Sequence, residues 1–437
     1  MHTLEQLRAG QLAGIQRLQM SCGLSEFPQE IFDLADTLEI LDLSGNALSS
    51  LPDDLPRLHK LRIIFCSANQ FTTLPAVLGA CPALTMIGFK SNQIREVPAA
   101  ALPPALRWLV LTDNQVEQLP AAIGRCAPLQ KLMLAGNRLS TLPPELAACS
   151  RLELLRIAAN RLSELPLWLL GMPRLSWLAY AGNPFCEADE LAAEAGAGIA
   201  SIGWDRLSIQ QKLGEGASGV IHQAVLRQAD GARAVAVKMF KGAVTSDGLP
   251  RCEMTACVSS GEHPNLIPVL GEVHDHPEGA KGCVMPLIDP GFGNLAGPPS
   301  LDSCTRDTYP DSKRFSPAEL LRIAGGIASA ARHLHGRGIM HGDLYGHNIL
   351  HCDQGRSLLG DFGAASLFAP DAPYAAGLQR LEVRAFGHLL DELMARCELP
   401  IAQQAALTEL QTACVQTDPV ARPSLADVEQ RIASIHI

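Results

Sequence analysis

The stretch LEILDLSGNALSSLP, residues 38–52, recurs through the first half of the chain with one internal spacing. Each full copy carries apolar residues at its first, fourth and sixth positions, an asparagine at its ninth, and a proline at its end, and the last copy, from Leu175, is partial. The asparagines are Asn46, Asn69, Asn92, Asn114, Asn137, Asn160 and Asn183, in steps of 23, 23, 22, 23, 23 and 23 residues. A constant period of this length predicts a stack of similar structural turns.

The pattern LxxLxLxxN resembles leucine-rich repeats over about residues 12–186. The resemblance implies an α/β solenoid in which each LxxLxL is a short strand with its leucines turned inward. The buried asparagine then satisfies backbone groups that the curved stack leaves unpaired, so these residues are structural. We expect residues 1–14 and 186–200 to cap the stack, and the repeat domain to span residues 1–200.

Side chains that point outward from the predicted strands are unusually apolar for a surface. They include Trp108, Trp177, Phe65, Met86, Val110, Met133 and Leu154. Exposed aromatic and methionine side chains are typical of protein-binding surfaces, so the concave face is predicted to bind a protein. In the alternative interpretation, the capping elements or the neighbouring domain cover this surface.

Length and composition favour a two-domain protein without membrane or nucleic-acid contacts. The chain has 437 residues, 47% of them apolar, and a formal net charge of −10 with no basic stripe. It shows neither a secretory signal nor about 18 consecutive apolar residues, so we expect a cytoplasmic protein. Thirteen cysteines without a CxxC pair are expected to be free thiols.

The second half contains a series of motifs in a fixed order. LGEGASGVIHQAV (213–225) precedes VAVK, which ends at Lys238, and Glu253 follows in a segment with helical spacing. HGDLYGHN begins at His341 and DFG at Asp361. This order resembles the protein-kinase signature set and extends over about residues 205–437. The resemblance implies a two-lobed α+β domain over residues 201–437.

The resemblance also implies roles for five residues. Lys238 would neutralise the α- and β-phosphates of ATP, held by an ion pair with Glu253. Asp361 would bind Mg²⁺, and Asn348 would supply a second metal contact. Asp343 would accept or orient the proton of the substrate hydroxyl.

Further positions are assigned by the same resemblance. Gly214, Gly216 and Gly219 would let the backbone lie close over the triphosphate. The adenine pocket is predicted to consist of Val220, Ala236 and Leu350 around the base, Met285 at the rear, and a hinge that includes Leu287. His333, His335, His341, His347 and His351 resemble a metal cluster, but we favour structural roles because His341 stands where the kinase loop carries a structural histidine.

The chain departs from the kinase pattern at several places. Asp361 and Glu382 are only 21 residues apart, and no Ala-Pro-Glu motif is present to pair with Arg422. Gly342 replaces the usual arginine, and Tyr345 stands where serine/threonine kinases usually have lysine.

All residues needed for phosphoryl transfer are nevertheless present. We therefore expect an ATP- and Mg-dependent protein kinase, serine/threonine-specific, whose repeats select a partner. The short segment after DFG and the HGD spelling leave open a small-molecule phosphotransferase. An adaptor that only binds nucleotide is a third hypothesis, which retention of Lys238, Asp343 and Asp361 disfavours.

Overall fold

A computed structural model describes residues 1–196, 198, 200–216, 218–229, 231–241, 244, 245 and 247–435. The chain divides into two compact units, Met1–Met172 and Pro173–Ile437. The last predicted repeat turn, around Asn183, therefore lies in the second unit. The domain boundary predicted at residue 200 separates the repeat motifs from the motifs of the second half, and it stays a prediction.

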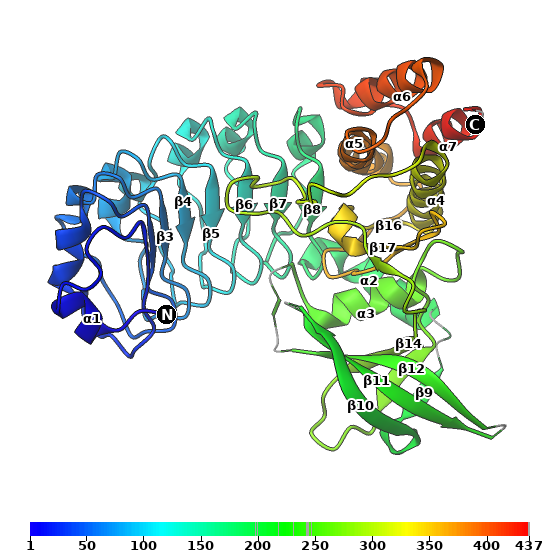
Figure 1. Cartoon of the computed structure of the whole chain (residues 1–437), viewed down its shortest axis with the longest axis horizontal. Coiled ribbons are helices and arrows are strands. Elements are labelled where there is room, and N and C mark those ends of the chain that lie inside the picture. Colours follow the sequence, from blue (N-terminus) through cyan, green and yellow to red (C-terminus); the bar gives the residue numbers. More distant parts are fainter. Residues whose placement is uncertain are drawn as a thin grey trace. The chain divides into compact units, whose positions relative to one another are not determined.

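The first unit is a stack of short parallel strands, each followed by one turn of 3-10 helix on the opposite face (Figure 1). The strands pair in one register, with Leu41 beside Ile64 and Ile87 beside Leu109. After helix α1 (Leu4–Arg8), the strands are β1 (Arg17–Gln19), β2 (Ile40–Asp42), β3 (Ile63–Phe65), β4 (Met86–Gly88), β5 (Trp108–Val110), β6 (Lys131–Met133) and β7 (Leu154–Arg156). The 3-10 helices are η1 (Gln29–Leu34), η2 (Leu55–Arg57), η3 (Ala76–Ala80), η4 (Ala99–Ala101), η5 (Ala121–Arg125), η6 (Pro144–Ala148) and η7 (Leu167–Gly171).

The repeated asparagines hold successive turns together. The side-chain oxygen of Asn137 accepts a hydrogen bond from the Val116 amide at 2.9 Å. Its amide nitrogen donates to the carbonyls of Leu111 and Leu134, both at 2.9 Å. Because strands only three residues long leave backbone groups unpaired at each turn, an amide side chain at this position satisfies donors and acceptors together. The predicted solenoid is confirmed.

The second unit begins with the last repeat. It contains β8 (Trp177–Ala179), η8 (Pro184–Cys186) and helix α2 (Glu187–Gly196). The predicted cap at residues 186–200 corresponds to α2, although Ala197 and Ile199 lie outside the described residues.

The small lobe of the second unit is a mixed sheet with one helix. Its strand order is β10-β11-β12-β14-β13-β9, and apolar side chains such as Val235, Val237 and Val284 form its core. The elements are β9 (Ser201–Gly203), η9 (Trp204–Arg206), β10 (Leu207–Glu215), β11 (Gly219–Gln228), β12 (Gly231–Phe240), α3 (Pro250–Ser259), β13 (Gly271–His274) and β14 (Gly282–Pro286).

The larger lobe is mainly helical. A capping box in which Ser316 and Glu319 bond reciprocally starts its long helix α4. Its elements are β15 (Gly293–Asn294), α4 (Pro317–Gly336), β16 (Ile339–Met340), η10 (Gly346–Asn348), β17 (Ile349–His351), β18 (Ser357–Leu359), β19 (Ser366–Leu367), α5 (Ala375–Met394), α6 (Ile401–Cys414), η11 (Pro419–Ala421) and α7 (Leu425–Ala433). The predicted fold class, a repeat solenoid followed by a two-lobed α+β domain, is confirmed.

Within the described residues, no helix combines the length and the apolar character that crossing a membrane would require.

Candidate active site

The phosphate-binding end of the site centres on one buried lysine. Lys238 on β12 forms an ion pair with Glu253 on α3, and its ammonium lies 3.8 Å from the nearer carboxylate oxygen of Asp361. Burial alone would lower the pKa of Lys238, but the carboxylates of Glu253 and Asp361 outweigh it and raise that pKa. The lysine is therefore charged over the physiological pH range and suits an anionic ligand.

Helix α2 of the last repeat braces α3, the helix that carries Glu253. The guanidinium of Arg251 on α3 lies 3.4 Å from Glu190 and 3.5 Å from Glu194, both on α2. Thr255 on α3 also donates to Glu194 at 3.1 Å. These contacts tie α3 to α2 and so support the position in which Glu253 meets Lys238.

The catalytic loop places Asp343 and Asn348 side by side. The amide nitrogen of Asn348 donates to the carboxylate of Asp343 at 2.8 Å and to its backbone carbonyl at 2.9 Å. His341, fully buried, contacts the Gly360 carbonyl through Nε2 at 2.9 Å. The histidine thereby links the loop to the residue that precedes Asp361.

The residues predicted to bind metal have suitable chemistry for Mg²⁺. The side-chain nitrogen of Asn348 donates to Asp343, so the side-chain oxygen of Asn348 is the atom that can bind a ligand. The Asp361 side chain is 53% exposed, and its backbone lies in the left-handed region with φ of 54°. Hard oxygen donors of this kind fit a magnesium ion.

A cavity of about 530 Å³ lies next to this cluster and extends between the lobes of the second unit. It is lined by Ala236 and Leu350, predicted beside the adenine, by Met285, predicted at the rear, and by the predicted hinge residue Leu287, together with Lys238 and Asp361. A mainly apolar pocket of this size with a few polar groups at one end is typical of a nucleotide-sized ligand site.

Val220 departs from the prediction, because it is absent from the described lining whereas Ile221 is present. Successive side chains of a strand point to opposite faces, so Ile221 and Gln223 on β11 face the cavity and Val220 does not. Ile221 follows the third glycine by two residues, a spacing that would have identified it from the sequence.

The three glycines of the predicted phosphate loop differ in their surroundings. A Cβ atom at Gly219 would lie 2.5 Å from the Met239 carbonyl oxygen, so the close approach of β11 and β12 requires glycine. Among the described residues, a Cβ atom at Gly214 or Gly216 would meet nothing within 4 Å. Their predicted role beside the triphosphate stays a prediction, and Ala217, which precedes Ser218 and Gly219, lies outside the described residues.

The structure explains why glycine replaces the usual arginine at position 342. The residue has φ of 72°, and its amide donates to the buried carboxylate of Glu382 at 2.8 Å. A Cβ atom here would lie 2.4 Å from the Ala364 carbonyl oxygen and 2.7 Å from that of Leu178. The backbone of β8 thus packs directly against the catalytic loop.

Trp177 of the last repeat contacts the catalytic loop directly. Its indole Nε1 donates to the Leu344 carbonyl at 3.1 Å, and its ring stacks on Tyr345 with centroids 4.2 Å apart. The side chain is 1% exposed. The prediction that Trp177 lies on a free protein-binding surface is therefore wrong, because the neighbouring domain covers it.

The last repeat also holds the segment that follows Asp361. The hydroxyl of Ser366 accepts hydrogen bonds from the amides of Tyr180 at 3.0 Å and Ala181 at 3.2 Å. The Tyr180 hydroxyl donates to the Leu367 carbonyl at 3.2 Å. Strand β19 is thus fixed by neutral hydrogen bonds to residues 180 and 181.

Backbone carbonyls surround Arg422, whose partner the sequence left unidentified. Its guanidinium donates to the carbonyls of Pro173 at 2.9 Å, Arg380 at 3.0 Å and Gln416 at 2.9 Å. Burial lowers its pKa to about 10. The arginine that would pair with an Ala-Pro-Glu carboxylate is therefore satisfied by three carbonyls, one of them from the last repeat.

The five clustered histidines contact different partners. Among the described residues, no group of three or more His, Cys, Asp or Glu side chains is arranged to hold a metal ion. The partners are the Ser260 carbonyl for His333, Glu382 for His335, the Gly360 carbonyl for His341, Asp307 for His347 and Lys313 for His351.

Comparisons with known proteins agree with the fold and the site. Residues 207–386 match the model of the protein tyrosine and serine/threonine kinase family, and residues 37–58 match the Leucine Rich Repeat model. The chain therefore combines a leucine-rich repeat region with a protein kinase domain.

Relatives with similar sequences are kinases. The serine/threonine-protein kinase AfsK of Streptomyces coelicolor is 30% identical over 156 residues, which cover 36% of this chain and 18% of AfsK. The serine/threonine-protein kinase mos of Gallus gallus is 28% identical over 176 residues, 38% of this chain and 49% of mos. A "Probable serine/threonine-protein kinase" of Arabidopsis thaliana is 28% identical over 110 residues, 25% of this chain and 17% of that protein. The chain thus spans half or less of the length of each.

Restoring the usual kinase arginine at position 342 is expected to damage the protein. Gly342→Arg would push a side chain into the carbonyls of Leu178 and Ala364 and impose a strained positive φ, so we expect a loss of about 2 kcal/mol or more in stability. The measurement is thermal or chemical denaturation of the full chain. Gly336→Ala is the control, since a Cβ atom there meets nothing within 4 Å. Equal stability of Gly342→Arg and the wild type would contradict this packing.

Proposed function

We propose that this chain is an ATP- and Mg-dependent protein kinase that phosphorylates serine or threonine residues. The main support is a charged group of residues that lines one cavity, next to a catalytic loop that is hydrogen-bonded to Gly360 beside Asp361. Lys238, Glu253 and Asp361 form a charged cluster at the cavity, and Asp343 and Asn348 are paired on the adjoining catalytic loop. A retired kinase would be expected to have lost one of these groups.

Each residue has a distinct proposed task. Mg-ATP, when bound, supplies the phosphoryl group and the metal charge. Lys238 binds the α- and β-phosphates, while Asp361 and the amide oxygen of Asn348 bind the metal. Asp343, oriented by the Asn348 amide, receives or directs the proton of the acceptor hydroxyl.

A small-molecule phosphotransferase remains the second candidate. The observation that favours it is the short segment between Asp361 and Glu382, which carries little surface for docking a peptide. Incubation of the full chain with labelled ATP and magnesium, with and without cell extract, separates the hypotheses. Label on protein supports the protein kinase, label only in the small-molecule fraction supports the second candidate, and no transfer to either supports the adaptor.

The two aspartates are expected to fail in different ways. Asp361→Ala should lose magnesium-dependent ATP affinity, since it removes a metal ligand, whereas Asp343→Ala should keep that affinity and lose phosphoryl transfer. Calorimetric titration with Mg-ATP and a transfer assay on a generic acceptor protein give the two readings. Asp353→Ala, on an exposed turn, is the matched control. An equal loss of ATP affinity in the two variants would contradict the different roles proposed for Asp361 and Asp343.

Activity is expected without phosphorylation of the segment after Asp361. Ser366 is buried and already bonded to two amides, and Gly342 provides no cation to bind a phosphate. Treatment with a broad-specificity phosphatase should therefore leave the rate unchanged, with mass spectrometry showing Ser366 unmodified. A rate that drops on treatment and returns with phosphate on Ser366 or Tyr374 would refute this expectation.

The repeats are proposed to select the protein partner through the concave strands of the first unit. Trp108, Phe65 and Met133 are the proposed contacts, and the Lys131 ammonium lies 4.2 Å from the centre of the Trp108 ring. Trp108→Ala should weaken binding of a partner recovered from extract by about 2 kcal/mol or more, while transfer to a generic acceptor stays unchanged. Leu167→Ala, an exposed residue of η7, is the control. Unchanged recovery by Trp108→Ala would exclude this surface.

A further inference from the structure

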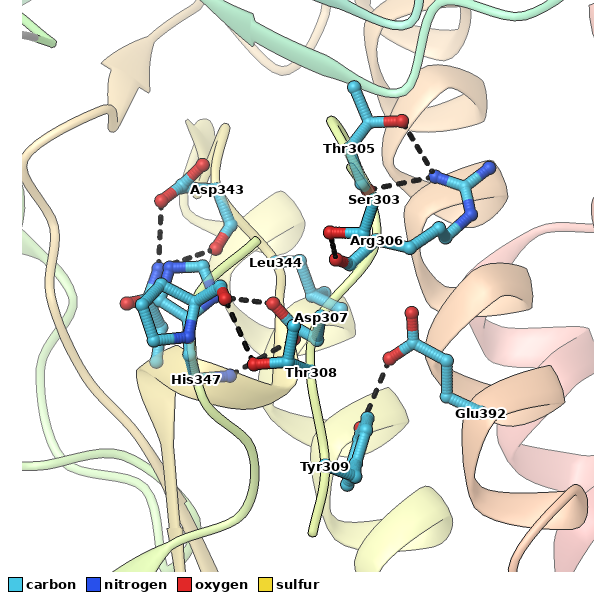
Figure 2. Close-up of polar contacts among 12 residues, drawn as sticks. Ser303, Thr305, Arg306, Asp307, Thr308, Tyr309, Asp343, Leu344, His347 and Glu392 are labelled. Atoms are coloured by element: carbon cyan, nitrogen blue, oxygen red, sulfur yellow. Dashed lines mark hydrogen bonds and ion pairs between the residues drawn. The ribbon is translucent and has the colours of Figure 1, made fainter. Parts of the chain in front are cut away.

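A buried aspartate from outside the kinase motifs caps the single helical turn of the catalytic loop. This turn is η10 (Gly346–Asn348), and the first amides of such a turn have no acceptor inside it. Asp307 lies in the long segment between β15 and α4, and its side chain is completely buried. One carboxylate oxygen accepts the His347 backbone amide at 3.1 Å, and the other lies 2.7 Å from Nδ1 of the same residue (Figure 2).

The residue in the usual capping position does not perform this task. Tyr345 immediately precedes η10, and in the described part of the chain its side chain forms no capping hydrogen bond. Its ring is stacked on Trp177 instead, with centroids 4.2 Å apart. A turn whose own N-cap side chain is engaged elsewhere depends on an acceptor from a distant segment, and Asp307 supplies that acceptor.

The segment that carries the aspartate is anchored to the catalytic loop and closed on itself. We call residues 295–309 the connecting segment. The Leu295 amide donates to the Ile349 carbonyl at 2.9 Å, directly after η10. Gly297 and Thr308 exchange backbone hydrogen bonds of 2.7 and 3.0 Å, which close the segment into a loop. The aspartate precedes Thr308, so its backbone is fixed at the base of this loop.

Close packing at Gly346 holds the connecting segment against the catalytic loop. A Cβ atom at this glycine would lie 2.8 Å from the Tyr309 hydroxyl and 3.1 Å from a carboxylate oxygen of Asp307. The Tyr309 hydroxyl donates to Glu392 on α5 at 3.0 Å (Figure 2). The guanidinium of Arg396 lies 3.8 Å from the centre of the Tyr309 ring. The turn can therefore reach the buried carboxylate because position 346 lacks a side chain.

The shape of η10 determines whether Asn348 can reach Asp343. The Asn348 side chain turns back to donate to the Asp343 carboxylate at 2.8 Å, while its backbone amide closes the turn on the Tyr345 carbonyl at 3.2 Å. His347 lies inside this turn, so a bond to its amide acts on the geometry of the pair. Because the described lining of the nucleotide cavity includes none of residues 295–309, we expect the effect on the acceptor side of the reaction.

We propose that Asp307 is a positioning residue for phosphoryl transfer, which caps η10 and so keeps the Asn348 amide on the carboxylate of Asp343. The proposal rests on the proposed function, in which Asp343 receives or directs the proton of the acceptor hydroxyl. Asp307 acts only through the backbone of the catalytic loop. The connecting segment thus contributes to catalysis a residue that lies outside all the kinase motifs of the chain.

Three variants of the full chain test the capping hydrogen bond. Asp307→Ala removes the acceptor, whereas Asp307→Asn keeps a side-chain oxygen and gains a donor that can face Nδ1 of His347. At saturating Mg-ATP, transfer to a generic acceptor protein should fall about tenfold in Asp307→Ala and stay within about threefold of the wild type in Asp307→Asn. Asp302→Ala, an exposed aspartate of the same segment, is the control and should match the wild type.

Hydrogen exchange reports on the loop without any turnover. The peptide that contains residues 344–350 should exchange its amides faster in Asp307→Ala than in the wild type, and Asp307→Asn should restore slow exchange. Affinity for ADP without magnesium should be equal in all variants, since the predicted nucleotide contacts lie in the cavity. A lower transfer rate at unchanged ADP affinity separates positioning from loss of the fold.

A double-mutant cycle separates positioning from general support of the structure. If Asp307 acts through the Asn348 amide, adding Asp307→Ala to Asn348→Ala should lower the transfer rate by less than about twofold further. Should Asp307→Ala lose ADP binding, Gly346→Ala replaces it in the cycle, because the added methyl group separates the turn from the same carboxylate.

Two results would overturn the inference. One is fast exchange of the loop in Asp307→Ala together with a wild-type transfer rate. The other is a double variant whose loss equals the product of the two single losses, which would make Asp307 a structural residue only. Failure of the kinase function is distinguishable. A wild type that transfers phosphate to no acceptor would refute the activity, whereas fast loop exchange in Asp307→Ala that Asp307→Asn reverses would still support the capping contact.

Discussion

The second unit depends on the docking of Trp177 against the catalytic loop. Its indole is hydrogen-bonded to the Leu344 carbonyl and stacked on Tyr345, which places an aromatic side chain of the repeat directly beneath the residues that flank Asp343. Burial of two stacked aromatic rings contributes several kcal/mol, and the indole donor removes the cost of an unpaired polar group. This contact explains Tyr345, which departs from the kinase pattern. The other departure, Gly342, is explained by the nearby carbonyls of Leu178 and Ala364.

The same repeat and the helix that follows it contact two further segments of the site, helix α3 and strand β19. Helix α2 holds α3 through Arg251, and residues 180 and 181 hold Ser366 in β19. The contacts of α2 with α3 include ion pairs, whereas the contacts of residues 180 and 181 with β19 are uncharged hydrogen bonds. Because neutral bonds do not depend on a phosphate, the geometry that joins Lys238 to Glu253 and Asp361 is available without modification.

The sequence predicted the fold because its signals are local patterns. The asparagine period identifies the solenoid. The resemblance to the kinase motifs proposes roles for Lys238, Glu253, Asp343, Asn348 and Asp361, and these roles stay predictions. Val220 was predicted to lie beside the adenine, but Ile221 lines the cavity instead. Because side chains alternate along a strand, these two neighbours point to opposite faces. Partners contributed by distant segments carry no such pattern. The Pro173 carbonyl at Arg422, the contact of Trp177 with Leu344 and the contact of Asp307 with His347 join residues 40 to 249 positions apart, and only the folded backbone reveals them.

The carbonyl of Pro173 that binds Arg422 shows that the two motif regions do not separate cleanly. A catalytic fragment that starts at residue 201, where the kinase motifs begin, would lack this carbonyl, the indole beneath Leu344 and the amides that hold Ser366. In this fragment the guanidinium of Arg422 would lose one acceptor, and the ring of Tyr345 would lose the indole that covers it. A fragment that starts at Pro173 would keep all three contacts. A cut of this chain before Pro173 therefore leaves the contacts of the catalytic loop, Ser366 and Arg422 intact, whereas a cut after the last repeat removes them.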